Sequence, residues 1–177
     1  LRAWFRPEYN GPTGAIATVE NATGAIRVIA SGITYGDDLE AGERPYDLAT
    51  GSARNAGSAF KPFTLTAALE NGDLEGRPVT LASLWDRSSP AVIDCGYPCS
   101  ADGDTWTVEN AGGNAAHELQ SLEAATYNST NTVYARLIDA IGPAVVVETA
   151  RELGITSQYL KPFHAITLGA ASVSPLE

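Results

Sequence analysis

Residues 57–63 read Gly57-Ser58-Ala59-Phe60-Lys61-Pro62-Phe63, and from here apolar side chains recur at helical spacing as far as Asn71-Gly72. This periodicity predicts a helix, which the Asn-Gly pair ends. Proline is tolerated only in the first helical turn, where its missing N–H needs no partner, so Pro62 indicates a start near Gly57 or Ser58. The predicted first turn then carries Ser58 and Lys61 three residues apart, on one face of the helix.

The chemistry of this pair suits a nucleophile and its base. A serine hydroxyl is a poor nucleophile until a neighbouring group takes its proton, and a neutral lysine amine is able to do so. Burial lowers a lysine pKa, and the apolar rings of Phe60 and Phe63 flank Lys61 in the sequence. The alternative is an N-cap serine followed by a surface lysine, because Ser-x-x-Lys alone is a weak motif. The aromatic flanks favour the catalytic interpretation.

A second polar group lies at Ser129-Thr130-Asn131, between two segments with helical periodicity. A hydroxyl and a carboxamide two residues apart on a turn are able to face one cleft, where the hydroxyl relays a proton and the amide binds a peptide group. The alternative is an ordinary helix connection with an asparagine cap. The triplet alone does not decide between them.

The remaining pattern predicts a mixed α and β chain. Two β-rich runs at 15–19 and 25–30, separated by a turn with Asn and Gly, predict a hairpin. Further helices are expected from Glu118, over 132–140 and over 143–153, the last closed by Gly154. Residues 31–57 and 73–110 are rich in Gly, Asp, Ser and Pro and are expected to be largely irregular.

Composition limits the function classes. The chain has 177 residues, 44% of them hydrophobic, and a formal net charge of −10. A core is therefore expected to form. The acidic balance argues against nucleic acid as a partner and against an electrostatic anchor on anionic lipid, because both need clustered Lys and Arg. No apolar run approaches the length of a membrane span, and no signal peptide is visible.

The two cysteines, Cys95 and Cys99, lie in a stretch rich in Gly, Pro and Ser. With only two distant histidines, they match none of the usual zinc spacings. One interpretation is that the cysteines bind a metal ion or carry out redox chemistry. The other, which the surrounding loop composition favours, is a small disulfide that closes one loop and indicates an oxidising compartment.

Taken in order along the chain, these segments resemble one family. Ser58-x-x-Lys61, followed by Ser129-Thr130-Asn131, resembles the motif set of the penicillin-recognising serine enzymes. Residues 57–63 are similar to the nucleophile segment of transpeptidase domains in class A, bifunctional penicillin-binding proteins. Residues 13–32 resemble the opening hairpin of those domains. Their middle section is similar to Glu109-Asn110 with residues 121–125, and a later segment is similar to residues 168–169 with 174–177.

The resemblance implies a fold and a set of roles. The fold would be α+β, with a central antiparallel sheet sandwiched by helices. Ser58 would be the acylated nucleophile, and its backbone N–H one half of the oxyanion hole. Lys61 would be the general base, Ser129 would pass a proton to the leaving nitrogen, and Asn131 would hold Lys61 and the substrate amide. Thr130 would point away from the chemistry, and no metal or organic cofactor is implied.

One family motif is missing from residues 1–177. No Lys-Thr-Gly, Lys-Ser-Gly or His-Thr-Gly triplet occurs, although the family carries one beyond the point where this sequence ends. The resemblance therefore implies that the chain is the N-terminal portion of a transpeptidase domain. A second polypeptide segment would bring the missing motif. A membrane anchor, and a glycosyltransferase domain, would also lie outside this chain.

The implied activity is that of a peptidoglycan D,D-transpeptidase. Stem peptides ending in D-Ala-D-Ala would acylate Ser58 and then be crosslinked, and β-lactams would acylate the same serine and inhibit it. The work would take place at the outer face of the cytoplasmic membrane. The alternatives are a β-lactamase or D,D-carboxypeptidase of the same fold, or a non-enzymatic β-lactam sensor domain.

Overall fold

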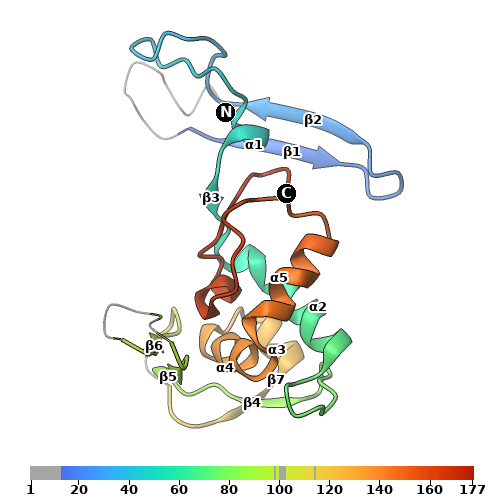
Figure 1. Ribbon diagram of the computed structural model, residues 1–177, viewed down its shortest axis with the longest axis vertical. Helices are drawn as coiled ribbons and strands as arrows, with labels where there is room; N and C mark the ends of the chain where they lie inside the picture. Colours follow the sequence, from blue (N-terminus) through green and yellow to red (C-terminus); the bar gives the residue numbers. More distant parts are fainter. Residues whose placement is uncertain (1–12, 98, 100–102, 114) are drawn as a thin grey trace. The chain divides into compact units, whose positions relative to one another are not determined.

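The computed structural model describes residues 13–97, 99, 103–113 and 115–177. The chain forms two compact units. Unit 1 comprises the chain up to Arg54 together with Ser172–Glu177, and unit 2 comprises Asn55–Ala171 (Figure 1). Two short strands, β3 (Arg54–Asn55) and β8 (Ser172–Val173), lie where the chain passes from one unit to the other.

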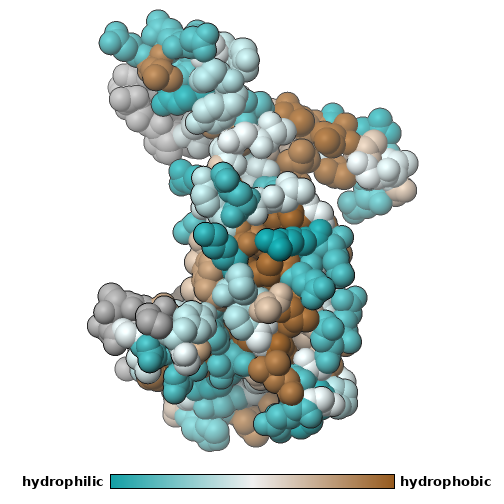
Figure 2. All heavy atoms as spheres, in the orientation of Figure 1, coloured by the Kyte–Doolittle hydropathy of each residue, from teal (hydrophilic) through white to brown (hydrophobic). Residues whose placement is uncertain are grey.

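Unit 1 is built on the expected hairpin. Strands β1 (Ala15–Val19) and β2 (Ile26–Ser31) pair antiparallel, with Ala15 opposite Ser31. Gly24, at a φ of +70°, donates its N–H to Glu20 O at 2.8 Å and so closes the turn. Several apolar side chains of the hairpin are exposed, Ile26 by 50%, and apolar residues gather there in Figure 2. Helix α1 (Leu48–Gly51) falls in the segment that was expected to be irregular.

The core of unit 2 is helical. A 3₁₀ turn, η2 (Gly57–Phe60), leads into α2 (Lys61–Asn71), which packs against α4 (Asn131–Ile141) and α5 (Pro143–Glu152). A second 3₁₀ turn, η3 (His164–Leu168), packs on α4. The large side chains that are fully buried here include Phe60, Leu122, Tyr134, Leu137, Ile138 and Val146. Burial of this apolar area is the main term that stabilises the unit.

Two strand pairs border these helices. Strand β4 (Leu84–Asp86) pairs with β7 (Leu119–Ser121), and β5 (Ala91–Asp94) pairs with β6 (Thr105–Val108), both antiparallel. The β5–β6 pair packs its buried face on α4 through Ala91, Ile93, Val108 and Ala135. The α+β class is confirmed. The described strands form two-stranded pairs, so a single central sheet stays a prediction.

The helix predictions hold, with one correction. Helices α4 and α5 match the expected ranges within a residue or two, and Gly72 and Gly154 follow the ends of α2 and α5 as expected. The helix expected from Glu118 is wrong at its start: α3 is confined to Leu122–Tyr127. Residues 119–121 pair with β4 instead, and the Ser121 hydroxyl then caps α3 by accepting from Ala124 N at 3.2 Å.

None of the helices in the described part of the chain combines the length and apolarity that a membrane crossing requires.

Candidate active site

Ser58 lies on the 3₁₀ turn η2, where the chain enters α2, and is exposed to solvent. Gly57 has a φ of +60°, and its N–H donates to Gly169 O at 3.3 Å. A Cβ on Gly169 would lie only 2.1 Å from Gly57 O, so this close backbone contact requires glycine. Gly169, which follows η3 in the sequence, thus supports the turn that carries Ser58. A helical turn begins at Gly57 as predicted, but it is a 3₁₀ turn, and the α-helix itself begins later, at Lys61.

Lys61 is the first residue of α2 and is only 3% exposed. Its Nζ donates to three oxygens: Ser129 O at 2.6 Å, Ser129 Oγ at 2.9 Å and Asn131 Oδ1 at 2.8 Å. The same ammonium group lies 5.3 Å from the centroid of the Tyr134 ring. An ammonium has three donors, so these acceptors satisfy it fully. The interpretation of Lys61 as a surface lysine is therefore excluded.

Burial lowers the pKa of Lys61 from its ordinary 10.5 to about 8. All three of its acceptors are neutral, and no carboxylate of the described residues lies within 4 Å to stabilise the charge. The fully buried Phe60 precedes Lys61, and its ring packs on Phe63 with centroids 4.8 Å apart. At neutral pH a usable fraction of the Lys61 amine is therefore unprotonated.

The turn that faces Lys61 has an unusual backbone. Ser129 has a φ of +53°, a left-handed conformation that is costly for a residue with a Cβ. Flanking hydrogen bonds hold it: Ser129 N–H donates to Thr126 O at 3.1 Å, and Thr130 N–H donates to Ala125 O at 2.9 Å. In this conformation both the carbonyl and the hydroxyl of Ser129 accept from one amine. The strained residue is thus the one with most contacts to Lys61.

Asn131 begins α4, and its carboxamide is held at both ends. Its Oδ1 accepts from Lys61, while its Nδ2 donates to Glu109 O at 3.0 Å. Next to it, the side chain of Asn110 bonds both the N–H and the hydroxyl of Thr132. Asn110 and Thr132 were not predicted to support the site. Only the resemblance around Glu109-Asn110 gave a signal in the sequence.

Thr130, the middle residue of the triplet, donates its hydroxyl to Gln120 Oε1 on β7 at 3.0 Å. Of the four predicted site residues, the structure brings together Lys61, Ser129 and Asn131. Ser58 lies in the 3₁₀ turn η2, three residues before Lys61, and its hydroxyl neither donates nor accepts a hydrogen bond among the described residues. Tyr134 was missed, although its place one turn after Asn131 puts it on the same helix face.

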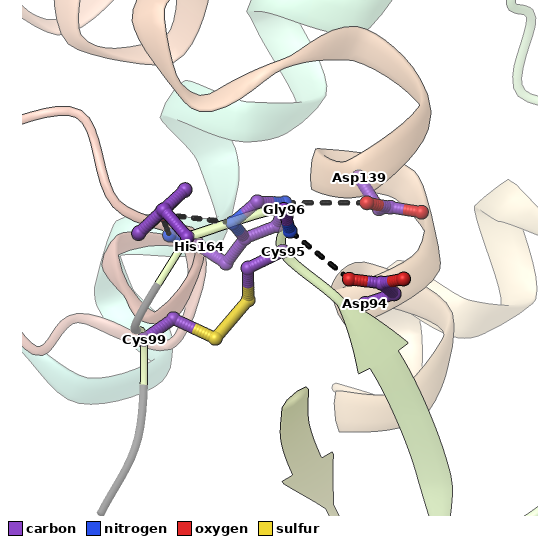
Figure 3. The surroundings of a disulfide bond; sticks show 7 residues. Asp94, Cys95, Gly96, Cys99, Asp139 and His164 are labelled. Carbon is purple, nitrogen blue, oxygen red and sulfur yellow. Dashed lines mark hydrogen bonds and ion pairs between the residues drawn. A yellow bond between two sulfur atoms is a disulfide. The ribbon is translucent and has the colours of Figure 1, made fainter. Parts of the chain in front are cut away.

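A second polar cluster surrounds the disulfide Cys95–Cys99 (Figure 3). The expected disulfide is confirmed, so these cysteines are not thiolate ligands for a metal. Within the described residues, no group of three or more His, Cys, Asp or Glu side chains could hold an ion. The loop that the disulfide closes carries Tyr97, whose hydroxyl lies 3.0 Å from His164 Nδ1 and accepts from His164 N at 3.2 Å.

The other ring nitrogen of His164 lies 3.2 Å from Asp139 Oδ1 on α4. His164 is 6% exposed, and its ring also packs beside Trp106, with centroids 6.5 Å apart. The cluster therefore connects the disulfide loop, η3 and α4. Because η3 ends just before Gly169, whose carbonyl accepts from Gly57 N–H, it also supports the turn that carries Ser58.

Comparisons with known proteins agree with the resemblance seen in the sequence. No family model matches the chain. It is 27% identical over 164 residues to penicillin-binding protein 1A of Aquifex aeolicus, which covers 93% of this chain and 20% of that protein. The chain thus spans about a fifth of the length of the curated relatives it matches.

Solved structures show the same likeness. The crystal structure of penicillin-binding protein 1A from Haemophilus influenzae superposes with a TM-score of 0.72 and 25% identity, over 93% of this chain and 22% of that one. The imipenem acyl-enzyme complex of penicillin-binding protein A from M. tuberculosis has a TM-score of 0.69 over 97% of this chain and 45% of that one. At 22% identity, the second shows a shared fold only. The predicted resemblance is confirmed.

Proposed function

We propose that this chain, which belongs to the transpeptidase-domain family of class A penicillin-binding proteins, is the N-terminal portion (residues 1–177) of a peptidoglycan D,D-transpeptidase domain. One observation carries the proposal: the buried Lys61 amine, with a pKa of about 8, is bound by Ser129 and Asn131 one helical turn from an exposed Ser58. This is how a base is prepared for a serine nucleophile.

The proposed reaction has two halves. The neutral Lys61 amine takes the Ser58 proton while Ser58 Oγ attacks the carbonyl carbon between the two terminal D-Ala residues. The C–N bond breaks, the leaving nitrogen receives a proton through Ser129, and D-Ala departs from the acyl-enzyme. Asn131 holds Lys61 and binds the substrate amide, and the Ser58 N–H forms one half of the oxyanion hole. An amine of a neighbouring stem peptide then takes the acyl group.

Other parts of the proposal concern what surrounds this chain. A second polypeptide segment with a Lys-Thr-Gly-type motif would bind the substrate carboxylate, supply the second oxyanion N–H and complete a central antiparallel sheet. β-Lactams would acylate Ser58, since acyl-enzyme complexes with them are known for structural neighbours. The domain would work at the outer face of the cytoplasmic membrane, held by an anchor outside this chain. The disulfide suits that oxidising location.

Labelling with a fluorescent penicillin tests the assignment of Ser58. The complete domain, meaning this chain with the Lys-Thr-Gly segment, is expected to give a covalent adduct on the peptide that contains Ser58. Ser58→Ala should abolish the adduct, whereas the control Ser52→Ala, in unit 1, should label normally. Equal labelling of Ser58→Ala would overturn the proposal.

The lifetime of the adduct separates the alternatives. An acyl-enzyme that lasts many minutes, together with crosslinks formed from lipid-linked substrate, supports a transpeptidase. Rapid release by water would indicate a β-lactamase or carboxypeptidase. A stable adduct without any crosslinked product would indicate a β-lactam sensor.

A further inference from the structure

A cavity of about 340 Å³ lies on unit 2 beside the Ser129 turn, and the roles proposed above leave it unused. Its walls come from three places: the residue that follows β4, the loop after β6, and the segment from β7 to the start of α4. The lining residues that matter here are Arg87, Gly112, Gly113, Gln120, Asn128 and Ser129. Lys61 does not line it, whereas Ser129, which binds Lys61, does.

The lining suits a peptide. Gly112 and Gly113 leave room for a ligand, because a Cβ built on either would meet no heavy atom of the described residues within 4 Å. The Gly113 N–H already donates to Asn110 O at 2.9 Å. The side-chain amides of Gln120 and Asn128 add hydrogen-bonding groups. Arg87 contributes a guanidinium whose Nε pairs with the exposed Glu118 at 3.2 Å, while its side chain stays 41% exposed. A guanidinium is the side chain best matched to a carboxylate.

Ser129 connects this cavity to the chemistry. In the proposed first half-reaction, Ser129 gives a proton to the leaving nitrogen of D-Ala. The second half-reaction is its chemical reverse with a different amine, so by microscopic reversibility the attacking nitrogen must occupy the position that the leaving nitrogen vacated. That position is beside Ser129 Oγ. A peptide that delivers this amine therefore needs a binding surface that borders Ser129.

We propose that the cavity between Arg87, Gly112 and Ser129 binds the acceptor stem peptide, a peptide that carries a free amine and a carboxylate; this rests on the proposed transpeptidase function. The amine nitrogen attacks the acyl carbon on Ser58, a C–N bond forms, and the bond from that carbon to Ser58 Oγ breaks. One amine proton passes through Ser129 and Lys61 and returns to Ser58 Oγ. Arg87 binds the acceptor's carboxylate and holds the amine in place.

A larger side chain in the cavity should slow the second half-reaction, in which the acceptor amine attacks, without slowing the acylation of Ser58. Gly112 has no positive φ, and a Cβ there meets no heavy atom of the described residues within 4 Å, so Gly112→Leu adds a side chain at a position that lines the cavity. In the complete domain, β-lactam acylation of Ser58 is expected to be unchanged, whereas crosslinking of a stem-peptide donor to an acceptor peptide should fall by about tenfold or more. Ala82→Leu, at an exposed loop position of the same unit, adds a similar side chain and should change neither rate.

Removing the charge gives a second, milder test. Arg87→Gln is expected to raise the acceptor peptide's KM about tenfold, because a charge-assisted hydrogen bond is lost, with β-lactam acylation again unchanged. An acceptor whose carboxylate is amidated should show no difference between Arg87→Gln and the parent. Arg27→Gln, at another exposed arginine that pairs with a carboxylate, is the control.

The outcomes distinguish this inference from the function on which it rests. Normal crosslinking by both Gly112→Leu and Arg87→Gln would overturn the acceptor site and leave the transpeptidase intact. Absence of β-lactam acylation and crosslinking in the parent protein would overturn the function itself. If Gly112→Leu loses acylation as well, its fold is disturbed, and Arg87→Gln alone decides.

Discussion

Two buried basic groups, Lys61 and His164, contact the same helix, α4, in different ways. Lys61 binds near the start of α4, where its three acceptors are neutral oxygens of Ser129 and Asn131. His164 lies further along, with the carboxylate of Asp139 at one ring nitrogen and the hydroxyl of Tyr97 at the other. Both are almost fully buried, at 3% and 6% exposed.

The difference between them is the partner charge. At His164 the Asp139 carboxylate joins η3 to α4. Lys61 has neutral partners only, so burial acts against its charged form and lowers its pKa to about 8. Lys61 and His164 are thus buried to a similar degree, but only His164 has a carboxylate partner among the described residues.

The largest expected effect comes from removing the Lys61 amine. Lys61→Met keeps a long, unbranched side chain in the buried position and deletes the base. Acylation of Ser58 by a β-lactam should fall by about 10³-fold, the usual contribution of a positioned general base. Lys161→Met, at the exposed second lysine of the chain, is the matched control and should acylate at the parent rate. Stopped-flow labelling measures both, and equal rates would contradict the role of Lys61.

The next effect comes from giving Lys61 a carboxylate partner, as His164 has in Asp139. Asn131→Asp places a carboxylate where an amide oxygen now lies, 2.8 Å from Lys61 Nζ. A neighbouring negative charge raises the lysine pKa, so acylation at pH 7 should fall by about 10- to 100-fold. The midpoint of the pH–rate profile should move upward, and the rate should recover in alkali.

The matched control for this change is Asn71→Asp. It adds the same charge at the far end of α2, on a side chain that donates to Ala67 O and does not contact Lys61. A fall in rate for Asn131→Asp without any shift of the pH midpoint would show that charge pairing is not the cause.

The parent protein itself should show a pH dependence set by Lys61. In the proposed reaction only the neutral Lys61 amine takes the Ser58 proton, and burial lowers the pKa of Lys61 to about 8. The acylation rate should therefore rise about tenfold for each pH unit below this value and level off above it. Second-order labelling rates between pH 6 and 10 measure the profile. A flat profile across pH 8 would exclude Lys61 as the titrating base.

The smallest effect is expected at the His164 cluster. Tyr97→Phe removes the hydroxyl that meets both the backbone N–H and the ring of His164. The free energy of unfolding should drop by about 1–2 kcal/mol, from the lost and unsatisfied hydrogen bonds, while the acylation rate of the folded protein stays the same. Tyr127→Phe, at a side chain that is 90% exposed, should leave both quantities unchanged. If Tyr97→Phe lost acylation while its free energy of unfolding stayed at the parent value, the His164 cluster would contribute to the reaction and not only to stability.

Local signals explain the parts of the fold that were predicted well. Pro62 and Gly72 mark the two ends of one helical segment, and the Asn-Gly turn marks the hairpin. The start of α3 was missed because residues 119–121 have a helix-compatible pattern but pair with β4, which is 33 or more residues earlier in the chain. Such pairing depends on a distant partner, and no local pattern reports it.

The same division holds for the candidate site. The amino-acid order is enough to identify the groups: a serine and a lysine one turn apart, the Ser129–Asn131 triplet about 70 residues later, and two cysteines close enough to pair. The folded structure was needed to show that Ser129 has a left-handed backbone, that its two oxygens and the Asn131 amide surround Lys61, and that no described carboxylate contacts that amine. The physical reason is that a pKa depends on what lies around a group in space, and for Lys61 those neighbours come from another helix.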